Sequence, residues 1–225
     1  MQQKKIIIHL FLVLSYGAYS QSALPKGFME VQTVIPDLVI DLRYAKTNNF
    51  VGQKVPGYHS EKAILSMAAT TALVKVQNEL KIYGFGIKFF DGYRPQQAVN
   101  HFVHWAKNQN DTLMKAQYYP NLSKSMLFDQ QYIASRSGHS RGSSVDLTLI
   151  DFNTCLELDM GSPYDFFGEI SNLNYSKLTQ KQVWNRQLLR KVMKRHGFRS
   201  YAQEWWHFTL IDEPFPNTFF NFPID

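Results

Sequence analysis

Only one of the 225 residues is a cysteine, Cys155, so the chain cannot form an internal disulfide. Its stability must therefore come from a hydrophobic core or from a bound metal. Cys155 lies in a stretch of mixed apolar and polar residues, and we expect a buried structural thiol there rather than a nucleophile. Because no cysteine lies near the N-terminus, a lipid-anchored protein is not expected.

Long apolar runs are also missing, except for a short one at the N-terminus. There Lys4 and Lys5 precede the run Ile6 to Leu14, and small residues follow up to Ser20. This order predicts a signal peptide over residues 1–20 that is cleaved on export, with the periplasm as the destination. A retained membrane anchor is the alternative, but the run is short for a bilayer and we expect no stable membrane insertion.

The sequence shows no repeats and no linker, and 44% of its residues are hydrophobic, so residues 21–225 are expected to form one domain. Removal of the signal would lower the formal charge from +6 to +4, which is too weakly basic to indicate a nucleic-acid partner. One local basic group is interpreted as a solvated helix face; it comprises Arg186, Arg190, Lys191, Lys194 and Arg195. Nothing in the sequence indicates an oligomeric state.

Periodicity and chain-breaking residues predict the main elements. From Glu61 to Tyr83 apolar residues recur every fourth position, at 64, 68, 72, 76 and 80, and Gly84 then ends the predicted helix. Further helices are expected from Pro95 to Trp105 and over 181–196, strands over 86–91, 145–150 and 205–210, an extended segment or edge strand within 31–44, and irregular chain over 108–131. Strands scattered among helices, with a hairpin turn near 153–154, predict an α+β domain rather than a doubly wound parallel sheet.

Three residues offer the nitrogen and oxygen donors of a catalytic zinc site: His139, Asp146 and His207. His139 precedes a predicted strand, and Asp146 alternates with apolar residues near the start of that strand. Each residue also has a simpler interpretation. Asp146 could form an ion pair with Arg141, and His207, within the aromatic segment EWWHFTL, could be a hydrogen-bonded core histidine.

Glu204 is the candidate general base beside such a metal. It precedes His207 by three residues, a spacing that points two side chains to opposite faces of a regular strand. The pair can act together only if the chain bends at Trp205; otherwise Glu204 is a surface residue at a strand start. No H-E-x-x-H motif is present and the other histidines show no metal pattern, so spacing alone leaves these alternatives open.

Three segments resemble one family: DGYRPQQAVNHF at 91–102, SGHSRGSSVDLTL at 137–149 and EWWHFTL at 204–210. They are similar to the D-Ala-D-Ala dipeptidases of the VanX type, a branch of the LAS zinc peptidases. The similarity extends through DLRYAKTNNFVG, DMGSPYDFFGE and DEPFPNTFFNFP, and therefore covers nearly all of the chain after the signal. It implies a LAS/hedgehog-like α+β fold, one domain with a central and mainly antiparallel sheet flanked by helices.

The resemblance also implies one zinc ion per chain, bound by His139, Asp146 and His207. In this family pattern Glu204 acts as base and then as acid, and Arg94, at the predicted strand-to-helix corner, stabilises the developing oxyanion. The alternative for Arg94 is a structural ion pair with Asp91.

A free dipeptide carries an ammonium and a carboxylate, and the resemblance assigns residues to both ends. Asp165 and Tyr44 would hold the amino end, and Ser137 would bind near the carboxylate. Asp165 could instead cap a turn, and Tyr44 could simply pack.

The expected activity is therefore zinc-dependent hydrolysis of the small substrate D-Ala-D-Ala to two D-alanines, within cell-wall peptidoglycan metabolism. The alternatives are a D,D-carboxypeptidase or endopeptidase that trims peptidoglycan stem peptides, and a non-catalytic wall-binding domain. The predicted signal peptide departs from the best-known relatives, which act in the cytoplasm. Outside the membrane, the expected substrate is dipeptide released by wall turnover.

Overall fold

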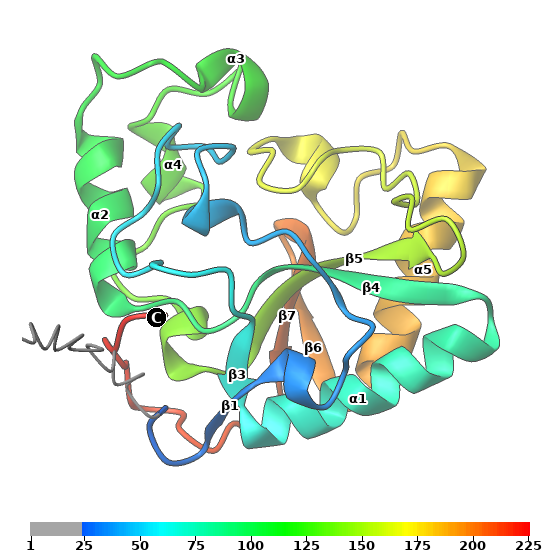
Figure 1. Cartoon of the computed structure of the whole chain (residues 1–225). Helices are drawn as coiled ribbons and strands as arrows, with labels where there is room; N and C mark the ends of the chain where they lie inside the picture. Colours follow the sequence, from blue (N-terminus) through cyan, green and yellow to red (C-terminus); the bar gives the residue numbers. More distant parts are fainter. Residues whose placement is uncertain (1–23) are drawn as a thin grey trace, which may run out of the picture.

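The computed structural model describes residues 24–225, and the predicted signal peptide lies outside these residues. A five-stranded sheet in the order β2-β4-β5-β7-β6 forms the centre of the fold (Figure 1). Its strands are β2 (Val39–Ile40), β4 (Phe85–Asp91), β5 (Ser144–Asp151), β6 (Phe198–Tyr201) and β7 (Glu204–Leu210). Only β2 and β4 pair in parallel among these strands, which confirms the α+β class and the mainly antiparallel sheet.

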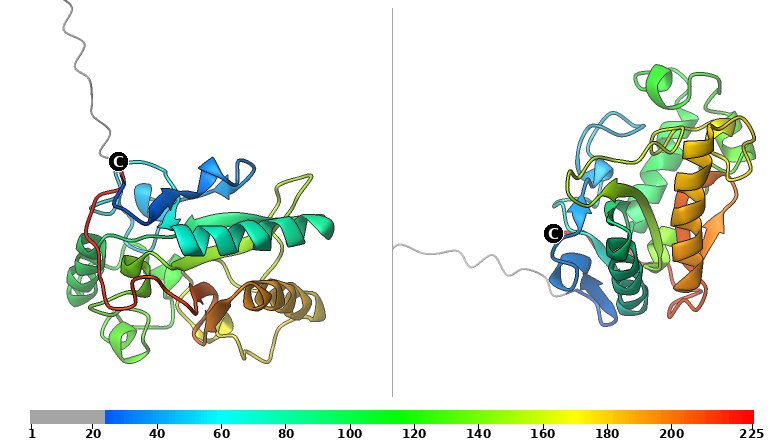
Figure 2. Two further views of the ribbon diagram at one scale, coloured as in Figure 1. Left: turned by 90° about the horizontal axis from the view of Figure 1, so that it is seen from below. Right: turned by 90° about the vertical axis from the view of Figure 1, so that its right-hand side faces the viewer.

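Two long helices, α1 (Met67–Ile82) and α5 (Gln180–Arg195), lie side by side against one face of this sheet (Figure 2). The helix α2 (Gln96–Lys107) and two short ones, α3 (Lys115–Tyr118) and α4 (Met126–Asp129), stand to the other side of it (Figure 1). A second, small antiparallel sheet joins β1 (Phe28–Glu30) to β3 (Ile64–Ser66). Four 3-10 turns complete the elements: η1 (Val31–Thr33), η2 (Arg43–Ala45), η3 (Gly138–Arg141) and η4 (Glu169–Ser171).

For the helix α1, the sequence predicted the C-terminal end correctly but not the N-terminal start. Gly84 follows its C-terminus with a φ of +79°, a conformation that glycine adopts without strain, so the predicted end is confirmed. The predicted start at Glu61 is wrong, because Ile64–Ser66 pairs with β1 and Ser66 then caps the helix by accepting a hydrogen bond from the Ala69 backbone. The buried face is correspondingly rotated, and it comprises Ala69, Thr70, Leu73, Val76, Gln77 and Leu80.

The remaining long helices and strands lie within two residues of their predicted bounds. Three other predictions are wrong: two concern the exposure of a side chain, and one concerns secondary structure. Cys155 is exposed, because it lies in the tight turn that follows β5, where the Asp151 carboxylate accepts a hydrogen bond from the Thr154 backbone. Arg186 is buried and is not part of a solvated helix face, although the other four basic residues of that group are exposed. The stretch over 108–131, predicted to be irregular, contains the short helices α3 and α4.

Among residues 24–225, no helix is both long and apolar enough to cross a bilayer.

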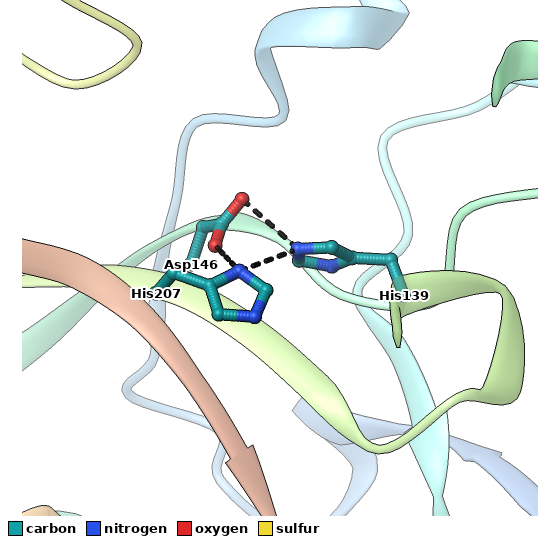
Figure 3. A group of neighbouring side chains, drawn as sticks. All are labelled: His139, Asp146 and His207. Carbon is teal, nitrogen blue, oxygen red and sulfur yellow. Dashed lines mark hydrogen bonds and ion pairs between the residues drawn. The ribbon is translucent and has the colours of Figure 1, made fainter. Parts of the chain in front are cut away.

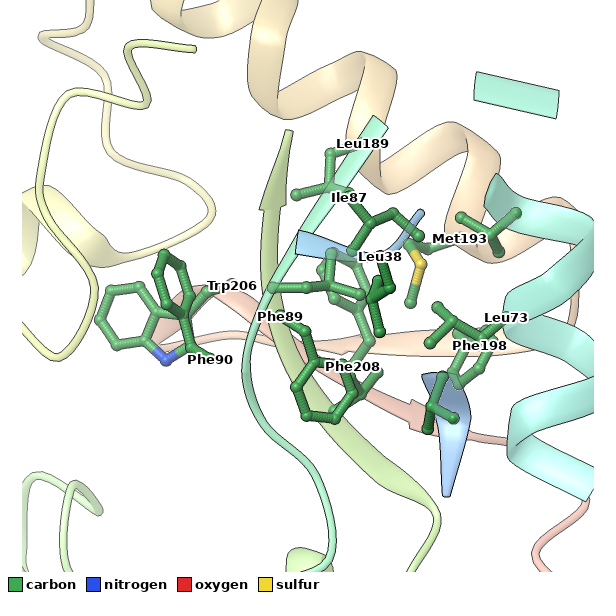
Figure 4. Packing of buried hydrophobic residues seen from close by; sticks show 14 of the residues in the cluster. Leu38, Leu73, Ile87, Phe89, Phe90, Leu189, Met193, Phe198, Trp206 and Phe208 are labelled. Carbon is green, nitrogen blue, oxygen red and sulfur yellow. The ribbon is translucent and has the colours of Figure 1, made fainter. Parts of the chain in front are cut away.

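Two hydrophobic clusters fill the interior. The sheet cluster lies mainly between the five-stranded sheet and the helices α1 and α5, where Leu73, Phe89 and Met193 meet (Figure 4). The aromatic cluster lies under the loops and α2, and its rings include Tyr44, Phe50, Phe102, Trp105 and Phe167. The candidate site described next lies where the open face of the sheet meets the aromatic cluster.

Candidate metal centre

Neighbouring strands supply two of the three candidate ligands. Asp146 of β5 and His207 of β7 are directly opposite each other in the antiparallel register. Alternate residues of β5, Val145 and Leu147, point into the sheet cluster, so Asp146 points to the opposite face. Its Oδ1 lies 3.0 Å from Nδ1 of His207. The register of the sheet therefore holds a carboxylate and an imidazole together.

His139 comes from the 3-10 turn η3, which ends in Gly142. Gly142 has a φ of +79°, and a Cβ at this position would overlap the ring of Phe28, so the turn requires glycine. The Nδ1 of His139 lies 2.7 Å from the backbone oxygen of Gly92. A carbonyl oxygen only accepts, so Nδ1 carries the hydrogen and Nε2 presents its lone pair to the other two ligands.

The three side chains converge on one point (Figure 3). Their potential ligand atoms all lie within 4.8 Å of one another; Nε2 of His139 is 3.1 Å from Nδ1 of His207 and 3.3 Å from Oδ2 of Asp146. Burial acts to raise the pKa of Asp146, but the two imidazoles outweigh burial and hold this pKa well below 3.8. Two imidazole nitrogens and one ionised carboxylate oxygen are a donor set that suits a catalytic zinc ion.

Of the alternative interpretations, the ion pair between Asp146 and Arg141 does not form, whereas the one for His207 holds in part. Arg141 forms a bidentate ion pair with Glu213 at 2.7 Å rather than with Asp146. His207 does hydrogen-bond, to Asp146 and to Thr209, but it faces the cavity next to His139.

The predicted bend between Glu204 and His207 is confirmed. Tyr201 pairs with Glu204 and Ser200 pairs with Phe208, so three residues of β7 stand opposite a single step of β6. This bulge turns both side chains to the same cavity, where Oε2 of Glu204 lies 3.9 Å from Nδ1 of His207. Burial and the negative charges of Asp146 and Asp165 raise the pKa of Glu204 well above 4.5, as expected of a group that binds and releases a proton.

Arg94 lies at the corner between β4 and α2, as predicted, and it reaches the same cavity. Its Nε donates to Asp91 at 2.9 Å, so the ion pair considered as an alternative exists. The pair does not remove Arg94 from the site, because Nη2 lies 3.6 Å from Oδ2 of Asp146. The guanidinium also lies 4.9 Å from the ring centre of Tyr44 and 5.3 Å from that of Phe102. Asp91 and the two rings thus fix a cation beside the candidate ligands.

Asp165 and Tyr44 meet in the lining of the cavity. The hydroxyl of Tyr44 donates to Oδ2 of Asp165 at 2.9 Å, and both residues are buried. Burial, reinforced by the charge of Asp146, raises the pKa of Asp165 to about 8. Asp165 also has a φ of +61°, a left-handed conformation that costs about 1–3 kcal/mol for a residue with a side chain. The surrounding loop must therefore hold Asp165 in place.

Ser137 also lines the cavity and lies directly before η3. Its Oγ accepts a hydrogen bond from the backbone of His139 at 3.3 Å, which leaves the hydroxyl hydrogen free to donate. The cavity as a whole has a volume of about 230 Å³, below the roughly 300–1,000 Å³ typical of drug-sized ligands. All eight residues singled out from the sequence line it: Tyr44, Arg94, Ser137, His139, Asp146, Asp165, Glu204 and His207.

Tyr164 is a contact that sequence reasoning missed. Its hydroxyl lies 3.2 Å from both the Tyr44 hydroxyl and Oδ2 of Asp146, so it connects the Tyr44–Asp165 pair to a candidate metal ligand. Tyr58 was missed too; its hydroxyl donates to Asp91 at 2.7 Å. The only available signal for Tyr164 was its position next to Asp165 in the segment DMGSPYDFFGE.

Comparison with known proteins places residues 25–225 in the peptidase M15 family, described as D-Ala-D-Ala dipeptidase. A D-alanyl-D-alanine dipeptidase of Enterococcus faecalis is 41% identical over 198 residues, which cover 88% of this chain and 98% of the relative. One of Streptomyces coelicolor is also 41% identical, over 197 residues with the same coverage of both chains. One of Escherichia coli is 32% identical over 185 residues, covering 81% of this chain and 83% of the relative.

Among solved structures, a point mutant of the vancomycin resistance D,D-pentapeptidase VanY, in complex with Zn(II), matches 68% of this chain and 75% of its own. The identity is 12% and the TM-score is 0.42.

Proposed function

The chain belongs to the peptidase M15 family of D-Ala-D-Ala dipeptidases, and from this premise we propose that it hydrolyses the free dipeptide D-Ala-D-Ala to two D-alanines. One observation carries the proposal. A metal-ligand cluster and a buried carboxyl, Asp165, line the same cavity of only about 230 Å³. Such a cavity can hold a short substrate by its ammonium while the peptide bond lies at the metal.

His139, Asp146 and His207 would hold one zinc ion per chain. The fit rests on the lone pair that His139 turns inward, on the ionised state of Asp146 and on the convergence of all three side chains. When bound, zinc polarises the substrate carbonyl and makes a water molecule more acidic.

Glu204 moves the protons. Its carboxylate lies next to His207, where it can accept a proton from the attacking water and later donate it to the leaving amine. Burial and the charges of Asp146 and Asp165 raise the pKa of Glu204, and a less acidic carboxyl is a stronger base toward the attacking water.

Arg94 stabilises the negative charge that develops on the carbonyl oxygen. Its guanidinium is already oriented by Asp91 and by the rings of Tyr44 and Phe102, so little reorganisation is needed during the reaction.

The two ends of the dipeptide meet different groups. Asp165, supported by the Tyr44 hydroxyl, binds the ammonium, and the free hydroxyl hydrogen of Ser137 donates to the carboxylate. An N-acylated stem peptide has no ammonium for Asp165 and would place its extra atoms against the buried Asp165 and Tyr44. This favours the dipeptidase over a D,D-carboxypeptidase or endopeptidase.

The proposal includes a place of action. We infer that residues 1–20 are a cleaved signal, that residues 21–225 form the catalytic domain, and that the enzyme acts in the periplasm on dipeptide released by wall turnover. The charged and then apolar order of the N-terminal residues supports this inference. N-terminal sequencing of protein recovered from the periplasmic fraction tests it; a mature chain that still begins at Met1 would contradict it.

The activity is tested with purified, zinc-loaded protein, by measuring D-alanine release from D-Ala-D-Ala and from N-acetyl-D-Ala-D-Ala. We expect rapid release from the free dipeptide and little from the blocked one. The variant Glu204→Gln, with its zinc content verified, is the matched control for contaminating peptidases. Faster turnover of the blocked substrate would instead indicate a carboxypeptidase, and zinc-loaded protein inactive on both would indicate a wall-binding domain.

A further inference from the structure

Arg186 of α5 is a buried cation that the proposed chemistry does not use. It is 7% exposed and forms no ion pair with a carboxylate within the described residues 24–225. Its partners are backbone carbonyls instead. Nε donates to Met160 at 2.6 Å, Nη2 to Ile170 at 2.7 Å and Nη1 to Asn172 at 3.1 Å. Burial lowers the pKa of Arg186 to about 10 although the charge of Asp159 acts to raise it. Burying a guanidinium whose hydrogen bonds all go to backbone carbonyls is therefore costly, and this arrangement needs a reason.

The three carbonyls enclose the segment that carries Asp165, which we name the Asp165 loop (Asp159–Asn172). Met160 lies before Asp165, whereas Ile170 and Asn172 lie after it, so one planar guanidinium fixes both ends of the loop. The preceding helix residue adds to this, because Asn185 Nδ2 donates to the carbonyl of Asp159 at 2.7 Å. Asp165 itself needs such support, because its φ of +61° is strained.

The same arginine lies next to the strand that carries Glu204. Its guanidinium carbon is 5.8 Å from the ring centre of Trp205, and the Trp205 indole donates to Ser162 Oγ of the Asp165 loop at 2.9 Å. Arg186, Trp205 and the loop therefore form one connected unit behind the cavity, although Arg186 does not line the cavity.

We propose that Arg186 is a positioning residue that sets substrate affinity, by closing the Asp165 loop so that the Asp165 carboxyl faces the ammonium of the substrate. The proposal rests on the proposed dipeptidase function. It assigns Arg186 no contact with the dipeptide, and its effect passes entirely through Asp165.

The test uses zinc-loaded protein with Arg186→Met, which keeps the apolar length and removes all donors. Arg190→Met is the matched control, because Arg190 lies one turn further along the same helix and is exposed. For D-Ala-D-Ala we expect the KM of Arg186→Met to rise at least tenfold, with kcat per folded, zinc-loaded enzyme changed less than twofold. Arg190→Met should keep both constants. A merely structural role would lower the active fraction or the Tm and leave the KM unchanged, and that result would overturn the proposal.

The route through Asp165 is tested by combining substitutions. In an Asp165→Asn background, Arg186→Met should change the KM less than twofold; an undiminished effect would show that Arg186 acts otherwise. Arg186→Lys covers the case in which Arg186→Met does not fold, because an ammonium can donate to some of the carbonyls but not in the planar pattern. We expect its KM to rise at least threefold, and a wild-type KM would overturn the proposal.

Hydrogen exchange separates this inference from the function itself. Backbone amides of the Asp165 loop should exchange faster in Arg186→Met or Arg186→Lys than in Arg190→Met, with no substrate present. Unchanged exchange would refute the proposal that Arg186 fixes the Asp165 loop. A wild-type enzyme that releases no D-alanine would refute the dipeptidase function alone.

Discussion

The two sides of the cavity are held by different means. On one side, which we call the metal wall, Asp146 and His207 project from paired strands whose opposite face packs into the sheet cluster. On the other, the recognition wall, Tyr44 and Asp165 come from a 3-10 turn and a loop beside the aromatic cluster. The first wall is positioned by a hydrogen-bonded ladder, and the second by individual side-chain contacts.

This difference means that the metal ligands are held in precise positions, whereas the residues that bind the substrate can adjust theirs. A catalytic metal requires its ligands within a few tenths of an ångström, which strand pairing provides at little cost. Recognition of one ammonium requires a single well-placed carboxyl, which a loop can provide if its ends are fixed. Substitutions in the metal wall should therefore abolish turnover, whereas those in the recognition wall should change affinity.

The largest effect is expected from removing a ligand in the metal wall. His207→Ala should bind no zinc at micromolar concentrations and lose all measurable hydrolysis, because only two ligands remain. Zinc should also stabilise the wild-type fold, by about 4 kcal/mol at 1,000 times its Kd, and should not stabilise the variant. Thermal unfolding with zinc and with a chelator measures this, with exposed His104→Ala as the control. Equal zinc stabilisation of both variants would place the metal elsewhere.

A smaller but still large loss is expected from Glu204→Gln. General acid–base catalysis contributes on the order of 10²–10⁴-fold, so kcat should fall by that factor while zinc remains bound. The bulge in β7 depends on strand pairing rather than on the charge of Glu204, so the fold should persist. Steady-state kinetics with metal analysis of the same sample checks this. Retained kcat in a zinc-loaded variant would exclude Glu204 as the proton carrier.

Asp165→Asn tests the recognition wall. It removes a charge-assisted hydrogen bond to the ammonium, worth about 1.5–3 kcal/mol, so the KM for D-Ala-D-Ala should rise about 10- to 100-fold with little change in kcat. Because asparagine tolerates a left-handed φ as well as aspartate does, the loop should keep its conformation. Asp129→Asn is the matched control on α4. A fall in kcat at constant KM would move Asp165 from recognition to chemistry, and the comparison between the walls would fail.

The same division explains how much the sequence could predict. The long elements have local signals, such as Gly84 after α1 and Pro95 before α2, and these predictions are close. The bend at Trp205 could also be deduced, because Glu204 and His207 can face one cavity only with a bulge. The ligand set of the metal wall could be proposed only from the resemblance of whole segments, because spacing alone left a simpler interpretation for each residue.

Other features depend on what lies nearby in space, and the sequence could not reveal them. Ile64–Ser66 continues the apolar pattern of the helix, but it forms a strand because it pairs with Phe28–Glu30, which is distant in the sequence. Arg186 belongs to a basic group on the sequence, yet carbonyls of a loop some twenty residues earlier surround it. The exposure of Cys155 depends on the tight turn at its position. The roles of the residues in both walls remain predictions.

A change of pH, with no substitution, should also distinguish the two walls. The raised pKa of Asp165, about 8, means that its carboxyl is largely protonated at pH 6 and becomes a carboxylate as the pH rises. The α-amino group of a dipeptide loses its proton near pH 8, so only a narrow range provides carboxylate and ammonium together. We expect the KM to fall by up to tenfold per unit from pH 6 toward 8 and to rise again above it. In Asp165→Asn the fall of the KM between pH 6 and 8 (the acidic limb) should disappear, because residue 165 no longer has a carboxyl to titrate. The rise of the KM above pH 8 (the alkaline limb) should remain. Initial rates across pH 6–9, with zinc content verified at each pH, measure both limbs; an acidic limb that persists in Asp165→Asn would assign it to another group.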